Sequence, residues 1–174
     1  MLISITGTES TGKTTLANQL AQHYGAGLVP DISRMVMERT GSNYTAVDVA
    51  NIAAEIIERE DALLKQSKEA IIISDNCLFN IQIWLEYYRW ETPEWLKDVL
   101  AHRKSDLYLL CDIDLDWVPD DQRKNPHDRE TLLVKFMEEM SSKGVNYKLI
   151  SGSGPDRLRA AVQQIDNFIN YTES

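Results

Sequence analysis

The segment that most constrains the fold of this chain is residues 7–14, which read Gly-Thr-Glu-Ser-Thr-Gly-Lys-Thr. They match the pattern G-x-x-x-x-G-K-[ST] in full. A short apolar run, Leu2–Thr6, precedes them, and residues 14–24 carry apolar side chains at helical spacing. This order predicts a buried strand, a glycine-rich turn and a helix, an arrangement in which backbone amides and the helix N-terminus bind phosphate groups.

The residue types in this loop each have a physical role in that prediction. Gly7 and Gly12 let the backbone turn tightly around the phosphates. Lys13 is expected to reach the β and γ phosphates, the Thr14 hydroxyl to ligate Mg²⁺, and Thr15 to contact the α phosphate. We therefore expect ATP and Mg²⁺ as cofactors. The residues expected to bind the nucleotide are Gly7, Thr8, Glu9, Ser10, Thr11, Gly12, Lys13, Thr14 and Thr15.

Strand and helix patterns alternate along the rest of the chain, which indicates a parallel sheet with helices on both faces. Thr45 and Asp48 form a capping-box pattern at one helix start, and Asp128 is an N-cap candidate at another. The predicted strands are Leu2–Thr6, Gly27–Pro30, Ala70–Ser74, Asp106–Cys111 and Asn146–Ile150. The predicted helices are Thr14–Tyr24, Asp31–Arg39, one from Thr45, Leu78–Arg89, Pro93–His102, Arg129–Lys143 and one from Pro155. The fold class is α/β, a P-loop NTPase fold with a five-stranded parallel sheet, like nucleoside and nucleotide kinases.

The composition excludes several kinds of partner. The net charge of −9 argues against a large nucleic-acid surface and against a basic membrane patch. No run approaches the roughly 20 apolar residues of a membrane helix, and the start lacks the basic segment of a signal peptide. Cys77 and Cys111 are too few for a disulfide framework, and we expect both to be buried thiols. We expect a single cytoplasmic domain spanning residues 1–174.

Among P-loop proteins, the sequence favours a small-molecule kinase. It has no N-K-x-D motif of the kind that reads guanine, and Ile71–Asp75 ends in one acid rather than a pair. Asp75 is expected to lie near Mg²⁺ or to accept a proton from a substrate hydroxyl, since phosphoryl transfer depends mainly on positioning and electrostatics. The alternative is that Asp75 caps a helix at the end of its strand, and the two roles can coexist.

A polar loop supplies cations in this acidic chain. We expect residues 113–128 to form a lid, with Arg123, Lys124 and Arg129 available to stabilise charge during transfer. A solvated surface loop is the alternative. Asp31 and Arg34 follow the second predicted strand, where they would hold the acceptor or form a surface salt bridge.

On these segments the chain resembles the NadR-like P-loop family, which includes ribosylnicotinamide kinase domains. The resemblance runs through residues 7–14, Asp31–Arg34, Ile73–Asp75 with Gln82, Asp106–Leu110, Asp116–Asp120 with Arg123, and Asp128–Arg129. The resemblance implies ATP, Mg²⁺ and transfer of the γ-phosphoryl group to the 5′-hydroxyl of nicotinamide riboside.

The resemblance also implies roles for individual residues. Lys13, Asp75, Arg123 and Arg129 would be catalytic, and Thr14 and Asp75 would hold the metal. Asp31, Arg34, Asp75 and Trp117 would contact the acceptor, and residues 151–155 would lie near the adenine. The chain has Pro30 where the family has an aromatic residue and Cys77 where it has a second acid. Trp84, Tyr87, Tyr88 or Trp117 would then supply the ring for the acceptor.

Two other functions remain open on the sequence. One is a regulatory switch that binds and hydrolyses ATP, and the other is a kinase for a nucleotide or another nucleoside. Apart from ATP and a nucleoside-like small molecule, we expect no nucleic-acid or membrane partner, and the sequence leaves a homo-oligomer open.

Overall fold

The computed structural model describes residues 1–40, 45–66, 71–120, 123, 125 and 127–172. Five strands form one sheet: β1 (Leu2–Thr6), β2 (Gly27–Val29), β3 (Ile72–Asp75), β4 (Leu107–Cys111) and β5 (Tyr147–Ile150). The described helices are α1 (Lys13–Tyr24), α2 (Ile32–Thr40), α3 (Ala46–Gln66), α4 (Leu78–Tyr87), α5 (Glu94–His102), α6 (Arg129–Ser142) and α7 (Gly154–Thr172). The predicted α/β fold is confirmed.

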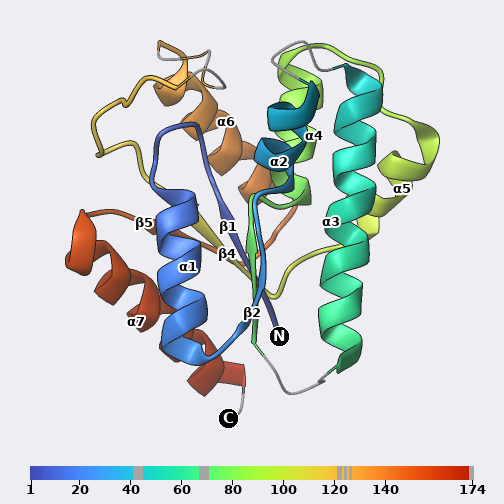
Figure 1. The fold of residues 1–174 in the computed structure, drawn as a ribbon. Coiled ribbons are helices and arrows are strands. Elements are labelled where there is room, and N and C mark those ends of the chain that lie inside the picture. Colours follow the sequence, from blue (N-terminus) through green and yellow to red (C-terminus); the bar gives the residue numbers. More distant parts are fainter. Residues whose placement is uncertain (41–44, 67–70, 121–122, 124, 126, 173–174) are drawn as a thin grey trace.

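All strand pairs in the sheet are parallel, in the order β2-β3-β1-β4-β5. The alternation of side chains along each strand divides the core between the two faces. Ile3 and Ile5 pack with α1 and α7, whereas Leu2 packs with α2, α3 and α4. The ribbon shows the sheet between these two layers (Figure 1). The carboxyl ends of β1, β3 and β4 therefore meet at one edge.

Most element boundaries lie within one residue of the prediction, and the differences that matter here are in α4 and β3. The fourth helix ends at Tyr87 instead of Arg89, because Arg89 has a left-handed φ of 54° and turns the chain out of the helix. The third strand includes Asp75, which is paired with Ile5 of β1. The predicted strand start at Ala70 lies outside the described residues.

The two predicted helix starts behave differently. At α3 the capping box is confirmed: the Asp48 carboxylate accepts hydrogen bonds from the amide and hydroxyl of Thr45. Asp128 stands at the N-cap position of α6, but its side chain makes no cap hydrogen bond. Its carboxylate instead accepts a hydrogen bond of 2.6 Å from the Tyr87 hydroxyl. Asp128 therefore ties α6 to α4.

Among the helices that the structure describes, none combines the length and the apolar character needed to span a membrane.

Candidate phosphate-binding and acceptor site

The phosphate loop, residues 7–14, connects β1 to α1 and has the strained backbone that its sequence predicts. Gly7, Ser10 and Gly12 have φ values of 132°, 57° and 75°. A Cβ atom at Gly7 would lie 3.0 Å from the carbonyl oxygen of Cys111, so glycine is needed there for the close approach to β4. Ser10 adopts the left-handed region without being glycine, a strained conformation of the kind that clusters at functional sites.

Lys13 is held over the phosphate loop. Its Nζ donates a hydrogen bond of 2.6 Å to the carbonyl of Thr8, which also accepts one of 2.9 Å from the Thr11 hydroxyl. Thr14 and Thr15 are exposed at the first turn of α1, beside the positive end of the helix. The ammonium, the two hydroxyls and the helix N-terminus therefore gather at one end of the loop, as phosphate binding requires.

Asp75 lies at the carboxyl end of β3 and is only 1% exposed. Neither of its carboxylate oxygens has a hydrogen-bond partner among the described residues. Burial, with a contribution from the nearby Asp31 carboxylate, raises the pKa of Asp75 to about 6, although Thr14 and Lys13 oppose the shift. The alternative that Asp75 only caps a helix is wrong, because Cys77 stands at the N-cap of α4 and the Asp75 oxygens bond to no described amide.

The donor set around Asp75 fits Mg²⁺ in the way that nucleotide enzymes use it. Unpartnered carboxylate oxygens and a nearby hydroxyl are hard oxygen ligands. No group of three potential metal-ligating His, Cys, Asp or Glu residues occurs among the described residues. The protein would therefore supply only part of the coordination, and substrate phosphates and water the rest.

Asn76 brings the start of α2 against the end of β3. Its side-chain amide donates hydrogen bonds to Asp31 Oδ1 at 3.1 Å and to Ser33 Oγ at 3.2 Å. Its own side-chain oxygen is buried and has no partner among the described residues. Asp31 also accepts the backbone amide of Arg34, so its orientation is fixed from two directions. The free oxygen of Asn76 is an acceptor available to a ligand hydroxyl or amine.

Arg34 is joined across the site to Asp120, in the segment that the sequence predicts to be a lid. Its Nη2 lies 2.7 Å from Asp120 Oδ2, and Arg123 approaches the same oxygen at 4.0 Å. Arg123 also donates to the carbonyl of Val118 and, at 3.5 Å, to the hydroxyl of Ser10. The structure therefore brings the predicted acceptor residue Arg34 and the predicted lid residue Arg123 to the same place.

Arg129 and Trp117 lie elsewhere. The Arg129 guanidinium bonds to backbone carbonyls, and its Cζ lies 5.9 Å from the centre of the Trp117 ring. Neither side chain lines the cavity described below. The catalytic role of Arg129 and the acceptor role of Trp117 stay predictions.

A cavity of about 310 Å³ runs from the phosphate loop into the space between α2, α3 and α4. Polar groups of Asp31, Arg34, Asn76, Asp120 and Arg123 line part of it, and apolar groups line the rest. The apolar lining is Met37, Val49, Ile52 and Trp84. Trp84 is the one aromatic residue in the described lining, and its ring packs against Tyr87 and Tyr88.

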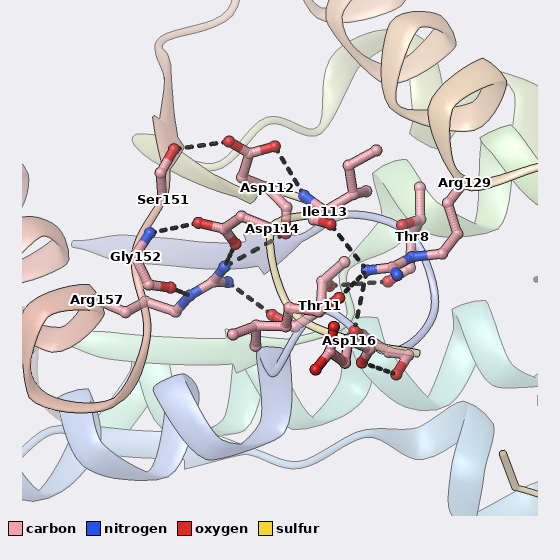
Figure 2. A network of polar contacts seen from close by, with 12 residues as sticks. Thr8, Thr11, Asp112, Ile113, Asp114, Asp116, Arg129, Ser151, Gly152 and Arg157 are labelled. Carbon is pink, nitrogen blue, oxygen red and sulfur yellow. Dashed lines mark hydrogen bonds and ion pairs between the residues drawn. The ribbon is translucent and has the colours of Figure 1, made fainter. Parts of the chain in front are cut away.

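Sequence reasoning missed two residues that support the phosphate loop. Asn80 accepts a hydrogen bond of 2.6 Å from the Thr6 hydroxyl and donates one of 3.0 Å to the carbonyl of Gly7. Arg157 reaches the loop from α7, as Figure 2 shows. A signal for Arg157 was present, because it stands four residues before Ala161 on the buried stripe of α7, where a cation is unusual.

Comparisons with known proteins agree with the fold. A family model described as an AAA domain matches residues 2–157. NadR in complex with NAD and AMP-PNP has a similar structure, with a TM-score of 0.77 and 16% identity, over 96% of this chain and 49% of that chain. The chain thus spans about half the length of that NadR chain. No curated protein matches the sequence.

Smaller kinases share the fold over nearly their whole length. Thymidylate kinase from Ehrlichia chaffeensis has a TM-score of 0.64 at 16% identity, covering 95% of this chain and 97% of that one. Deoxyadenosine kinase from M. mycoides with bound dATP has a TM-score of 0.58 at 14% identity, covering 95% of this chain and 99% of that one. At these identities the likeness shows the fold, and it confirms the NadR-like P-loop fold expected from the sequence. The family model covers most of the length of this chain, and the chain therefore belongs to the AAA domain family.

Proposed function

We propose that this protein is an ATP-dependent kinase that phosphorylates a hydroxyl group of a nucleoside-like acceptor, with nicotinamide riboside as the first candidate. The observation that carries the proposal is the continuous cavity, which joins the phosphate loop to a second compartment between α2, α3 and α4. An enzyme that only hydrolyses ATP needs the part beside the phosphate loop and not the second compartment. The whole cavity has a volume of about 310 Å³, at the lower end of the roughly 300–1,000 Å³ typical of small-ligand sites.

The second compartment has the chemistry that a nucleoside requires. Asp31 and the free oxygen of Asn76 accept hydrogen bonds and suit sugar hydroxyls. Ile52 and Trp84 offer apolar and aromatic surface to a planar base. This lining supports a ribonucleoside acceptor, and Trp84 takes the place of the aromatic residue that is absent at Pro30.

The proposed reaction is a direct transfer. The acceptor hydroxyl oxygen attacks the γ-phosphorus of ATP, the bond from that phosphorus to the β–γ bridging oxygen breaks, and ADP leaves. The hydroxyl proton passes to Asp75, whose pKa of about 6 leaves the carboxylate largely ionised at neutral pH. Lys13 and Arg123 stabilise the charge on the transferred group. Mg²⁺, when bound beside Thr14 and Asp75, would neutralise phosphate charge.

The test is ATP consumption in the presence of Mg²⁺ with a panel of acceptors: nicotinamide riboside, ribonucleosides, deoxynucleosides, thymidine monophosphate and none. Turnover that depends on a nucleoside supports the proposal, and turnover with nicotinamide riboside alone supports the specific acceptor. Equal turnover with and without every acceptor overturns it and favours the ATP-hydrolysing switch. Turnover with thymidine monophosphate alone assigns a nucleotide kinase instead.

A further inference from the structure

Two guanidinium groups support the phosphate loop from the side away from the cavity. Arg129 Nη2 donates hydrogen bonds to the carbonyls of Ser10 at 3.2 Å, Leu115 at 3.0 Å and Ile113 at 3.4 Å. Figure 2 shows these contacts on one side of the network and those of Arg157 on the other. Arg129 therefore joins the phosphate loop to the segment that follows β4.

Arg157 makes the matching contacts from α7, and it is only 4% exposed. Its Nη1 donates to the carbonyl of Thr11 at 2.7 Å, and its Nε donates to the carbonyl of Gly152 at 2.7 Å. Its Nη2 forms an ion pair with Asp114 and contacts the carbonyl of Asp112 at 3.4 Å. One buried side chain thus joins the phosphate loop, the segment after β4 and the loop after β5.

The geometry of the peptide bond turns these contacts into a constraint on the amides. In a trans peptide the carbonyl of one residue and the N–H of the next point in opposite directions, and the chain has no cis peptide bond among its described residues. Holding the carbonyls of Ser10 and Thr11 away from the cavity therefore directs the N–H groups of Thr11 and Gly12 toward it. Both residues line the cavity, and neither amide is bonded to another described residue.

The backbone of the loop needs such support. Ser10 has a left-handed φ of 57°, which is unfavourable for a residue with a side chain. Without its two anchored carbonyls, the loop would relax and its amides would lose their common direction. Arginine suits this role because its planar group carries five donors in fixed directions, whereas lysine presents a single ammonium that cannot span three segments.

We propose that Arg129 and Arg157 are positioning residues of the phosphate loop, which preset the amides of Thr11 and Gly12 to bind the phosphate groups of the nucleotide. The proposal rests on the proposed nucleotide binding, and it does not depend on which acceptor is used. Under this proposal Arg129 acts by holding a carbonyl of the phosphate loop and does not contact the transferred phosphoryl group. Arg157 contributes more of the support for the loop, since its contacts are shorter and it is more deeply buried.

The test compares Arg157→Met and Arg157→Lys with a matched control, Arg103→Met. Arg103 is a partly buried arginine, and its guanidinium bonds to Glu60 and Asp61, away from the cavity. Dissociation constants for ATP and for inorganic tripolyphosphate are measured by calorimetry, well below the melting temperature of each variant. Tripolyphosphate reports on the phosphate loop alone, because it lacks the base and the sugar.

The expected result for Arg157→Met is a loss of affinity of roughly 10-fold to 100-fold for both ligands. This is the effect of weakening one or two hydrogen bonds to a charged group. Arg157→Lys keeps the charge and loses affinity to a similar extent. Arg103→Met melts at a lower temperature but binds both ligands as the wild type does. If Arg157→Met does not fold, Arg157→Lys and the milder Asp114→Asn are compared with the same control.

Four outcomes overturn the proposal or separate it from the proposed function. Folded Arg157 variants that bind tripolyphosphate within twofold of the wild type overturn it, as does an equal loss in Arg103→Met. A wild type that binds neither ATP nor tripolyphosphate overturns both this inference and the proposed function. A wild type that binds both ligands with the predicted losses, yet phosphorylates no acceptor, supports the inference and overturns the kinase proposal.

Discussion

Replacing Asp75 by asparagine separates the stability of the fold from the proposed chemistry. The pKa of this buried carboxyl is raised from 3.8 to about 6, chiefly by burial, so its ionised form is unfavourable in the folded protein. Each pH unit between the folded and unfolded pKa values is worth about 1.36 kcal/mol, which gives about 3 kcal/mol in total. At neutral pH the wild type therefore forgoes about 3 kcal/mol of stability to keep an ionised carboxylate in the site.

The sign of the pH dependence follows from the direction of the shift. Because the folded pKa is raised, the folded protein binds this proton more tightly than the unfolded chain does. The contribution of Asp75 to stability is fully present below pH 3.8, and it is lost as the pH rises through about 6. Asparagine does not titrate, so the stability of Asp75→Asn relative to the wild type should rise by up to about 3 kcal/mol over this window.

The assay is urea unfolding of both proteins at intervals from pH 4 to pH 8, with the difference in unfolding free energy plotted against pH. In this difference between the two proteins, the contributions of the other titrating groups cancel. The cost of burying the amide is the same at every pH, so it does not change the shape of the plot. Glu138→Gln, the same kind of acid-to-amide change at an exposed position on α6, is the control. The same Asp75→Asn protein should bind ATP but transfer phosphate at least about 100-fold more slowly, since a proton acceptor is lost. A flat difference for Asp75→Asn refutes the burial argument, and unchanged transfer refutes the catalytic role.

Three further substitutions test other parts of the site. Lys13→Ala should abolish ATP binding at useful affinity together with transfer, and wild-type turnover in this variant would contradict the assignment of the phosphate loop. Trp84→Ala should raise KM for a nucleoside acceptor roughly 10-fold or more, because base stacking on an aromatic ring is worth about 1–3 kcal/mol. KM for ATP should stay nearly unchanged in the same steady-state assay. Trp95→Ala, on the exposed face of α5, is the matched control. Tyr87→Phe removes the hydrogen bond to Asp128 and should lower the unfolding free energy by about 1 kcal/mol in urea titration, whereas no loss would show that this bond adds nothing to stability.

The sequence was informative wherever local chemistry and periodicity decide the structure. The phosphate loop needs glycine at positions 7 and 12, and its flanking strand and helix follow from residue spacing. The apolar run at Ile72 and Ile73 belongs to a strand covered on both faces, which the pattern predicts. The capping box of α3 likewise depends on residues three positions apart. These features need no knowledge of the rest of the fold.

Contacts between distant segments were not predictable in the same way. Arg157 meets Thr11 across 146 positions, and Asn80 meets Gly7 across 73. The position of Asp128 at the start of α6 was correct, but its partner is Tyr87, which only the packing of α4 against α6 brings near. The sequence also offered four aromatic residues for the acceptor compartment. Only the fold places Trp84 at the cavity and Trp117 beside Arg129.

The distribution of charge around the cavity bears on the kind of acceptor that the proposed kinase would take. Asp31 and Asp120 line the acceptor end, and the guanidinium of Arg34 lies 2.7 Å from the carboxylate of Asp120. A phosphate group placed there would meet carboxylates and would have to displace Asp120 from Arg34 before it gained a cation. A nucleoside has no such charge, and a cationic base would be attracted to the same carboxylates. The fold is shared with a thymidylate kinase, but this electrostatic lining favours an acceptor that has not yet been phosphorylated.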